Sequence, residues 1–157
     1  MSYKGYYKPQ NVQKYKGNKH NIFYRSLWER KFMVYLDTNP KIISWSSEEI
    51  IIPYISPKDN KRHRYFPDFL VTANGDKGIN TYLCEIKPSN QCIPPKNKKS
   101  KYFLTEQKTF LINQAKWKAA ELVCKEKGWE WKIITEKELK IKYETNTKNN
   151  IRKRRAK

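Results

Sequence analysis

Hydrophobic residues recur at helical spacing in two stretches of the chain. The first stretch begins at Ser26 and ends before Pro40, because proline cannot continue a helix. The second covers Phe103–Lys127 and is followed by Gly128, a residue favoured at helix C-termini. A capping-box pattern over Thr135–Glu138 predicts one further short helix.

Short runs of β-branched and aromatic residues, bounded by turn signals, predict strands. Turns are indicated at Pro57–Asn60 and at Asn74–Asp76. The order of helix, strands, long helix and strand predicts an α/β fold, with a sheet built mostly from hairpins and helices packed against it. The predicted strands cover residues 42–45, 50–54, 64–71, 79–87 and 129–134, and Pro67 interrupts the third.

The net charge of the chain indicates what kind of partner it binds. The 157 residues include 34 Lys and Arg against 15 Asp and Glu, which gives a formal net charge of +19 at pH 7. Such an excess predicts contact with a polyanion, and nucleic acid is the first candidate. We predict one folded domain over residues 21–143, an irregular basic arm over residues 1–20, and a basic, disordered tail over residues 144–157.

Cysteine usage and hydropathy exclude several classes of protein. The three cysteines, Cys84, Cys92 and Cys124, include no CxxC pair, so they predict neither a disulfide framework nor a structural zinc site. No run approaches the roughly 20 apolar residues that span a membrane, and no glycine-rich phosphate loop is present. We therefore expect an intracellular protein that makes no membrane contact.

The candidate chemistry lies in two short motifs on neighbouring predicted strands, Phe66-Pro67-Asp68 and Glu85-Ile86-Lys87. Alternate side chains of a strand share a face, so Glu85 and Lys87 are expected side by side, and antiparallel pairing would bring Asp68 opposite. Two carboxylates suit Mg²⁺, and a lysine suits the phosphate on which such a metal acts. Taken singly, Asp68 is also an ordinary turn residue, and Glu85 with Lys87 is also a surface ion pair worth about 0.2–1 kcal/mol.

A third carboxylate, Glu29, lies in the first predicted helix. Its aromatic and hydrophobic neighbours indicate that this helix packs on the rest of the domain, so Glu29 could complete the pocket. The pattern Ser26-x-x-Glu29 is also a capping box, in which the Glu29 carboxylate would bond the Ser26 amide. The residues alone leave both interpretations open.

Together, Glu29, Pro67-Asp68 and Glu85-Ile86-Lys87 resemble the PD-(D/E)XK nuclease superfamily. Longer motifs, including Tyr24–Glu29 and Arg64–Asp68, make most of residues 3–142 similar to the head completion nucleases of tailed bacteriophages. The Tyr-Arg-Ser-x-x-Glu helix also resembles the catalytic domain of the endonuclease subunit of Tn7-type transposition machinery. That subunit has an additional C-terminal domain where this chain has a short basic tail, so we expect the phage type.

The resemblance implies a restriction-endonuclease-like core, with a mixed sheet flanked by helices, and a Mg²⁺- or Mn²⁺-dependent DNA endonuclease. It implies that Glu29, Asp68 and Glu85 are metal ligands and that Lys87 is the catalytic lysine. Double-stranded DNA would be the substrate and phage portal or head–tail connector proteins the partners, in the host cytoplasm or the virion head. The alternatives are a structural head-completion or portal-binding protein with weak or no cleavage, and a restriction, repair or transposition-type endonuclease.

Basic residues outside the motifs are expected to contact DNA phosphates, which predicts steep salt dependence of binding. They lie in a loop before the long helix, on that helix, and in the C-terminal tail. The predicted contacts are Lys96, Lys98, Lys99, Lys101, Lys116, Lys118, Arg152, Arg154 and Arg155.

Overall fold

A four-stranded mixed sheet forms the centre of the protein. The computed structural model describes residues 3–140 of the chain. The strands β3 (Ile42–Ser47), β6 (Phe69–Gly75), β7 (Gly78–Ile86) and β8 (Glu130–Ile134) lie in the order β3-β6-β7-β8. The β3–β6 and β6–β7 pairs are antiparallel, whereas β8 runs parallel to β7. The predicted α/β class with a mixed sheet is confirmed.

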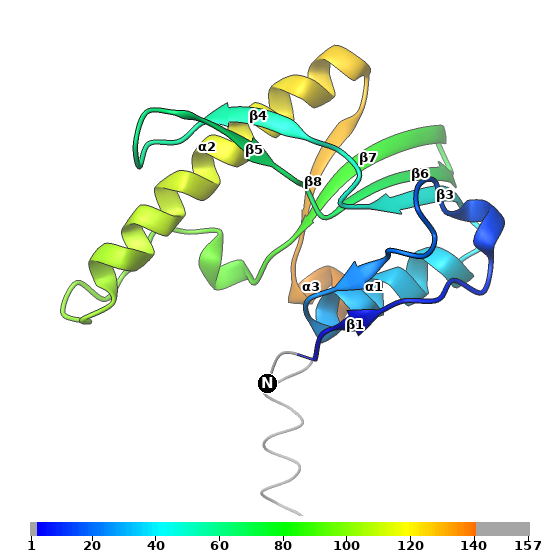
Figure 1. Ribbon diagram of the computed structural model, residues 1–157, viewed down its shortest axis with the longest axis horizontal. Helices are drawn as coiled ribbons and strands as arrows, with labels where there is room; N and C mark the ends of the chain where they lie inside the picture. Colours follow the sequence, from blue (N-terminus) through cyan, green and yellow to red (C-terminus); the bar gives the residue numbers. More distant parts are fainter. Residues whose placement is uncertain (1–2, 141–157) are drawn as a thin grey trace, which may run out of the picture.

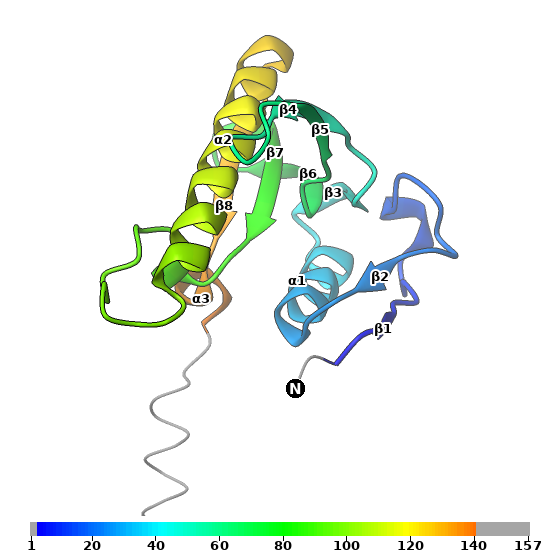
Figure 2. The same ribbon diagram turned by 60° about the vertical axis from the view of Figure 1, so that its left-hand side comes forward.

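Helices cover both faces of this sheet (Figures 1 and 2). The helix α1 (Leu27–Thr38) lies on one face together with the N-terminal segment. The long helix α2 (Phe103–Lys127) crosses the other face, beside the separate hairpin of β4 (Ile52–Ile55) and β5 (Arg62–Tyr65). The short helix α3 (Glu136–Leu139) follows β8 and contacts α1. Because both faces of the sheet are covered, an accessible functional site has to lie at an end or an edge of the sheet.

Each face of the sheet has its own hydrophobic cluster, because successive strand residues point to opposite sides. Trp45, Phe69 and Ile86 pack on the α1 side. Leu83 packs on the α2 side, against Trp117 and other residues of that helix. This alternation along β7 places Glu85 on the same side of the strand as Leu83, where α2 passes.

The N-terminal segment is tied to the body of the protein. It contains β1 (Gly5–Tyr6), which pairs with β2 (Phe23–Tyr24), and the single 3₁₀ turn η1 (Val12–Lys14). Tyr7 and Tyr15 belong to the hydrophobic cluster on the α1 side. Most of residues 3–20 lack regular structure, and the two buried tyrosines make this segment part of the core.

The fully buried Asp37 on α1 holds this segment. Its carboxylate accepts a 2.6 Å hydrogen bond from the Tyr7 hydroxyl and further bonds from the amides of Gln10 and Asn11, at 2.7 and 2.9 Å. The Lys14 ammonium donates to the Asp37 carbonyl at 3.1 Å and thereby caps the C-terminal end of α1.

Several sequence boundaries agree with the structure. The long helix covers Phe103–Lys127 as predicted, and Gly128 caps it with φ 70°. The capping box at Thr135 is also confirmed. The strand predicted over residues 64–71 with an interruption at Pro67 is divided there into two strands, β5 and β6. Pro67, which has no amide to donate to a ladder, lies between β5 and β6, and these strands belong to different sheets.

Two further predictions concern the membrane and the C-terminal tail. Within residues 3–140, no helix is long and apolar enough to cross a membrane. The predicted DNA contacts Arg152, Arg154 and Arg155 lie outside the described residues, as does the predicted tail over residues 144–157.

Candidate active site

Asp68 and Glu85 lie opposite each other where β6 begins and β7 ends. Phe69 pairs with Cys84, and this antiparallel register places Asp68 opposite Glu85. The Asp68 carboxylate accepts a 2.7 Å hydrogen bond from the Ile86 amide. The Glu85 carboxylate accepts a 2.6 Å hydrogen bond from the Tyr65 hydroxyl. The structure therefore brings together the two acids of the predicted pair, and a short hydrogen bond orients each carboxylate.

Burial dominates the electrostatics of this pair. Loss of solvent raises the pKa of Asp68 well above its ordinary value, and the neighbouring Glu85 charge raises it further. Burial also raises the pKa of Glu85, and the Tyr65 hydrogen bond and the Lys87 charge only partly offset this. Within residues 3–140, neither carboxylate forms a salt bridge. The site thus holds two poorly solvated carboxylates that no direct ion pair neutralises.

Glu29 approaches this pair from the first turn of α1. Ser26 is the N-cap, and its hydroxyl accepts a 3.2 Å hydrogen bond from the Glu29 amide, as a capping box requires. The Glu29 carboxylate bonds the Arg25 amide at 3.0 Å, where a capping box would have it bond the Ser26 amide. Burial raises the pKa of Glu29, and its charge in turn raises the pKa of Asp68. Glu29 is therefore both a helix-end residue and an electrostatic neighbour of Asp68.

Two lysines supply positive charge at the site. Lys87 follows Glu85 at the end of β7, its amide donates to the Ile134 carbonyl at 2.9 Å, and its ammonium lowers the pKa of both acids. The charge of Lys116 on α2 also lowers the pKa of Glu85. Its ammonium lies 5.6 Å from the centre of the Tyr65 ring, so this predicted DNA contact lies beside the acidic pair.

Sequence reasoning missed three residues at the site. Tyr65 lies within the Arg64–Asp68 motif, but the motif predicts no role for it. Arg25 and Glu48 form an ion pair with a 3.1 Å separation of Nε and Oε1, and the Glu48 amide donates to the Asp68 carbonyl at 3.1 Å. Glu48 adopts a positive φ of 54°, which turns the chain directly after β3. Arg25 lay within the Tyr24–Glu29 motif, whereas no spacing signal pointed to Glu48.

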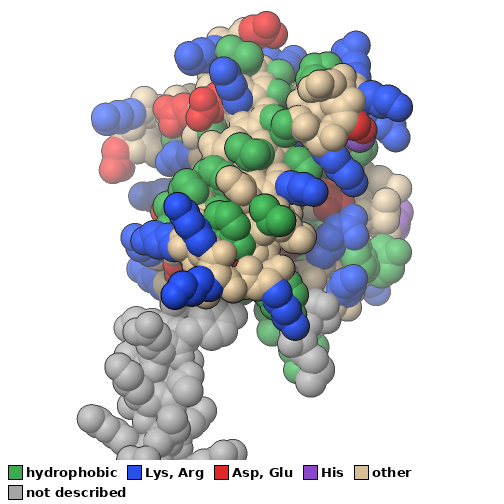
Figure 3. Space-filling view, turned by 90° about the vertical axis from the view of Figure 1, so that its left-hand side faces the viewer, with side chains coloured by type: hydrophobic (Ala, Val, Ile, Leu, Met, Phe, Trp, Pro, Cys, Tyr) green, Lys and Arg blue, Asp and Glu red, His purple; other side chains and the backbone are tan. Residues whose placement is uncertain are grey.

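The other predicted DNA contacts have different surroundings. The loop lysines Lys96, Lys98, Lys99 and Lys101 are exposed between the 3₁₀ turn η2 (Ser89–Gln91) and α2. Lys118 is exposed on α2 and lines a hollow with Cys92 and Trp117. Figure 3 shows the face that contains the start of α2, where Lys and Arg side chains predominate along the rim around a mainly uncharged centre.

The donor set fits a hard divalent cation only in part. Among residues 3–140, no three Asp, Glu, His or Cys side chains converge into a ready-made metal-binding group. Mg²⁺ often binds through one or two carboxylates and retains several waters, so the half-buried Asp68 and the buried Glu85 supply enough protein ligands for it. The three predicted ligands are thus a close pair and one nearby acid.

The chain is similar in sequence to known nucleases. A family model described as TnsA-like endonuclease N terminal matches residues 39–136. The head completion nuclease of Enterobacteria phage T4 is 37% identical over 142 residues, which cover 87% of this chain and 93% of the relative. The mixed sheet between helices is that of a restriction-endonuclease-like fold, as expected from the resemblance. The chain belongs to the TnsA-like endonuclease family.

Proposed function

We propose that the protein is a metal-dependent DNA endonuclease that hydrolyses phosphodiester bonds during completion of a phage head. The observation that carries this proposal is the close pair of the half-buried Asp68 and the buried Glu85, whose charges no salt bridge compensates within residues 3–140. Keeping two ionised acids together with little solvent costs stability, so a cation supplied on binding explains the arrangement better than a structural role does.

The chain's own residues prepare the site for a phosphodiester. The Ile86 amide and the Tyr65 hydroxyl orient Asp68 and Glu85, so that neither carboxylate has to be ordered when the substrate arrives. The Lys87 ammonium is placed to neutralise negative charge that develops on phosphate oxygens. Lys116 extends this positive charge along α2, toward the DNA backbone.

Asp68 and Glu85 would hold the cation, and Glu29 is the third acid available to it. Mg²⁺ or Mn²⁺, when bound, supplies Lewis acidity at the scissile phosphate. The Arg25–Glu48 ion pair lies beside these acids and limits the freedom of the turn that carries Asp68. The protein's contribution is therefore a fixed, poorly solvated pair of acids with two cationic side chains next to it.

The biological setting of the proposal rests on the T4 relative, whose name is head completion nuclease. By analogy, the substrate is double-stranded DNA that is packaged in, or protrudes from, a filled head before the tail joins. Portal or head–tail connector proteins would then be the partners, and the host cytoplasm or virion head the place of action. The net charge of +19 supports prolonged contact with DNA.

Plasmid cleavage tests this function. The full chain is incubated with supercoiled and linear DNA in Mg²⁺, Mn²⁺ or EDTA, beside Asp68→Asn and Lys87→Ala. Matched controls are Asp76→Asn and Lys77→Ala, which alter an exposed turn. We expect nicking or linearisation of the circle only with metal, lost in both site variants and kept in both controls. Absence of cleavage by a wild-type protein that still binds DNA would overturn the proposal.

A further inference from the structure

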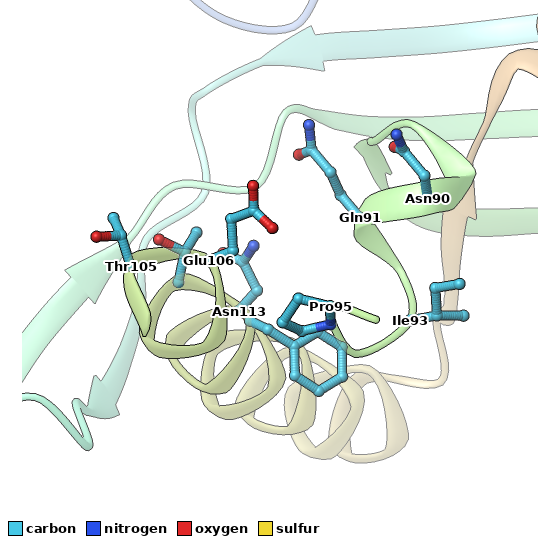
Figure 4. Close-up of a pocket in the computed structure, with 9 residues that line it drawn as sticks. Asn90, Gln91, Ile93, Pro95, Thr105, Glu106 and Asn113 are labelled. Atoms are coloured by element: carbon cyan, nitrogen blue, oxygen red, sulfur yellow. The ribbon is translucent and has the colours of Figure 1, made fainter. Parts of the chain in front are cut away.

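A pocket outside the acidic site lies between η2 and the first half of α2. It has a volume of about 340 Å³. The turn η2 and the loop after it form one wall, and α2 forms the other (Figure 4). The lining residues are Asn90, Gln91, Ile93, Pro95, Thr105, Glu106, Thr109, Phe110 and Asn113. Nothing in the proposed hydrolysis uses this pocket.

Asn113 is the residue that points to a ligand. It is only 8% exposed, and among the described residues its carboxamide has no hydrogen-bond partner. It also lines the pocket. Its carboxamide therefore keeps a donor and an acceptor free for a molecule that enters the pocket. A ligand that offers both donors and acceptors would satisfy it.

The charge of the lining excludes a phosphate as that ligand. In a protein with a net charge of +19, none of the lining residues is Lys or Arg, and Glu106 contributes a negative charge. The carboxamides of Asn90, Gln91 and Asn113 can pair with mixed donor and acceptor edges, and the Phe110 ring offers a flat apolar contact. Amides beside an aromatic ring suit a nucleobase, which has a polar edge and an apolar face.

The position of the pocket suits a nucleotide next to the cut. Asn113 precedes Lys116 on α2 by less than one turn, an axial rise of about 4.5 Å. The charge of Lys116 lowers the pKa of Glu85, so this part of α2 lies near the acidic site. Asn90 follows Lys87 by three positions in the chain. The wall formed by η2 is fixed, because the Ser89 amide donates to Glu136 on α3 at 3.0 Å. Exposed loop lysines lie between the two walls in sequence, where phosphates of the same strand would pass.

We propose that this pocket binds an unpaired nucleobase of the DNA adjacent to the cleavage site. The base enters between η2 and α2 with its polar edge toward Asn113 and Gln91, while its phosphates remain outside on the basic loop. Extruding a base from a duplex costs a few kcal/mol and costs least where the base is already unpaired. The protein therefore favours DNA with bulges, frayed ends or single-strand junctions. The inference rests on the proposed action on DNA.

Fluorescence anisotropy tests the pocket without requiring cleavage. In EDTA, the full chain is titrated into labelled duplexes that are identical except for a central bulge, which is either an adenine nucleotide or an abasic analogue. We expect roughly tenfold tighter binding of the adenine bulge. Asn113→Leu and Gln91→Ala should bring this ratio close to one, whereas Gln107→Ala, an exposed amide outside the pocket, should leave it unchanged.

The outcomes separate this inference from the proposed function. Equal affinity of the wild type for both bulges, or a ratio that survives Gln91→Ala in a folded protein, would overturn the base pocket. If plasmid cleavage still occurs in that case, the nuclease proposal stands. If the ratio behaves as expected and no metal supports cleavage, the pocket stands and the hydrolytic function falls. Loss of all DNA binding by the wild type would overturn both.

Discussion

At the scale of single residues, Glu29 has two roles that different substitutions can separate. Its amide is capped by Ser26, and its carboxylate bonds the Arg25 amide while acting on Asp68. Glutamine at this position keeps an oxygen for the Arg25 amide and removes the charge. Alanine at position 26 removes the cap and leaves the Glu29 carboxylate in place.

We predict that Glu29→Gln lowers the cleavage rate at least about tenfold without lowering the melting temperature. Ser26→Ala should show the reverse, a loss of about 1 kcal/mol in the free energy of unfolding with nearly normal cleavage. Thermal denaturation and plasmid nicking on the same preparations provide the comparison. A Glu29→Gln protein that cleaves normally would restrict Glu29 to its role at the helix end.

The acidic pair also predicts how stability depends on pH. Burial raises the pKa of Asp68 and Glu85 in the folded protein above the values they have in the unfolded chain. The folded state therefore binds these protons more tightly, and the stability gained from them is present at low pH and is lost as the pH rises through the raised pKa values. Without metal, the ionised pair destabilises the protein at neutral pH.

Asp68→Asn should consequently raise the melting temperature of the metal-free protein at pH 7 by a few degrees. An asparagine oxygen can still accept from the Ile86 amide, so the change removes charge and keeps the bond. The gain should shrink as the pH is lowered toward 4, and it should be absent for the exposed control Asp76→Asn. Scanning calorimetry in EDTA checks this, and a destabilised Asp68→Asn would contradict the electrostatic account.

At the scale of elements, the N-terminal segment depends on one carboxylate of α1. Burial by itself raises the pKa of Asp37, but hydrogen bonds from Tyr7, Gln10 and Asn11 outweigh it, so the net shift is downward. A lowered pKa means that this contribution to stability is present at neutral pH and is lost as the pH falls through the folded-state value. The stability that Asp37 contributes is thus lost as the pH falls, whereas the stability linked to the Asp68–Glu85 pair is lost as the pH rises.

We predict that Asp37→Ala lowers the free energy of unfolding by about 2–3 kcal/mol, since it leaves two amides and the buried Tyr7 hydroxyl without their acceptor. Limited proteolysis should then cut within residues 3–20 before the rest of the domain. Tyr7→Phe, which removes a single bond, should cost about 1 kcal/mol. Equal protease resistance of Asp37→Ala and wild type would show that the segment is held by its buried tyrosines alone.

Elements with local signals could be predicted from the sequence, and those that depend on distant partners could not. Helix α2 has its own periodicity and a glycine cap, so both of its ends were found. The Asp68–Glu85 pair followed from strand alternation and a short hairpin. The buried Tyr7 hydroxyl donates its hydrogen bond to Asp37, which is 30 positions away, and the Arg25–Glu48 contact spans 23 positions. Nothing local in the sequence marks such contacts.

At the scale of the whole molecule, the charge distribution should govern affinity for DNA. The loop lysines Lys96, Lys98, Lys99 and Lys101 are exposed, and the face that carries the start of α2 has Lys and Arg along its rim (Figure 3). Each phosphate neutralised by a lysine releases condensed counterions, so affinity falls linearly with salt on logarithmic axes. The slope reports how many of these lysines contact DNA.

Replacing all four loop lysines by alanine should reduce the magnitude of that slope by up to about 3.6, or about 0.9 for each lost contact. A matched set of exposed lysines elsewhere, Lys31, Lys41, Lys77 and Lys125, should change it less when replaced in the same way. Anisotropy titrations between low and moderate salt measure both slopes. Equal reductions in the two variants would show that the protein binds DNA through its net charge and not through this loop.

Metal-dependent cleavage at Asp68 and Glu85 is tested most sharply by measuring binding and cleavage separately on one DNA duplex. Binding is measured in EDTA and single-turnover cleavage in Mg²⁺, for the wild type, Asp68→Asn and Lys87→Ala. The account predicts similar affinities for all three proteins and cleavage at least about 100-fold slower in both variants. Wild-type rates in Asp68→Asn, or cleavage by the wild type that persists in EDTA, would contradict a metal-dependent nuclease centred on Asp68 and Glu85.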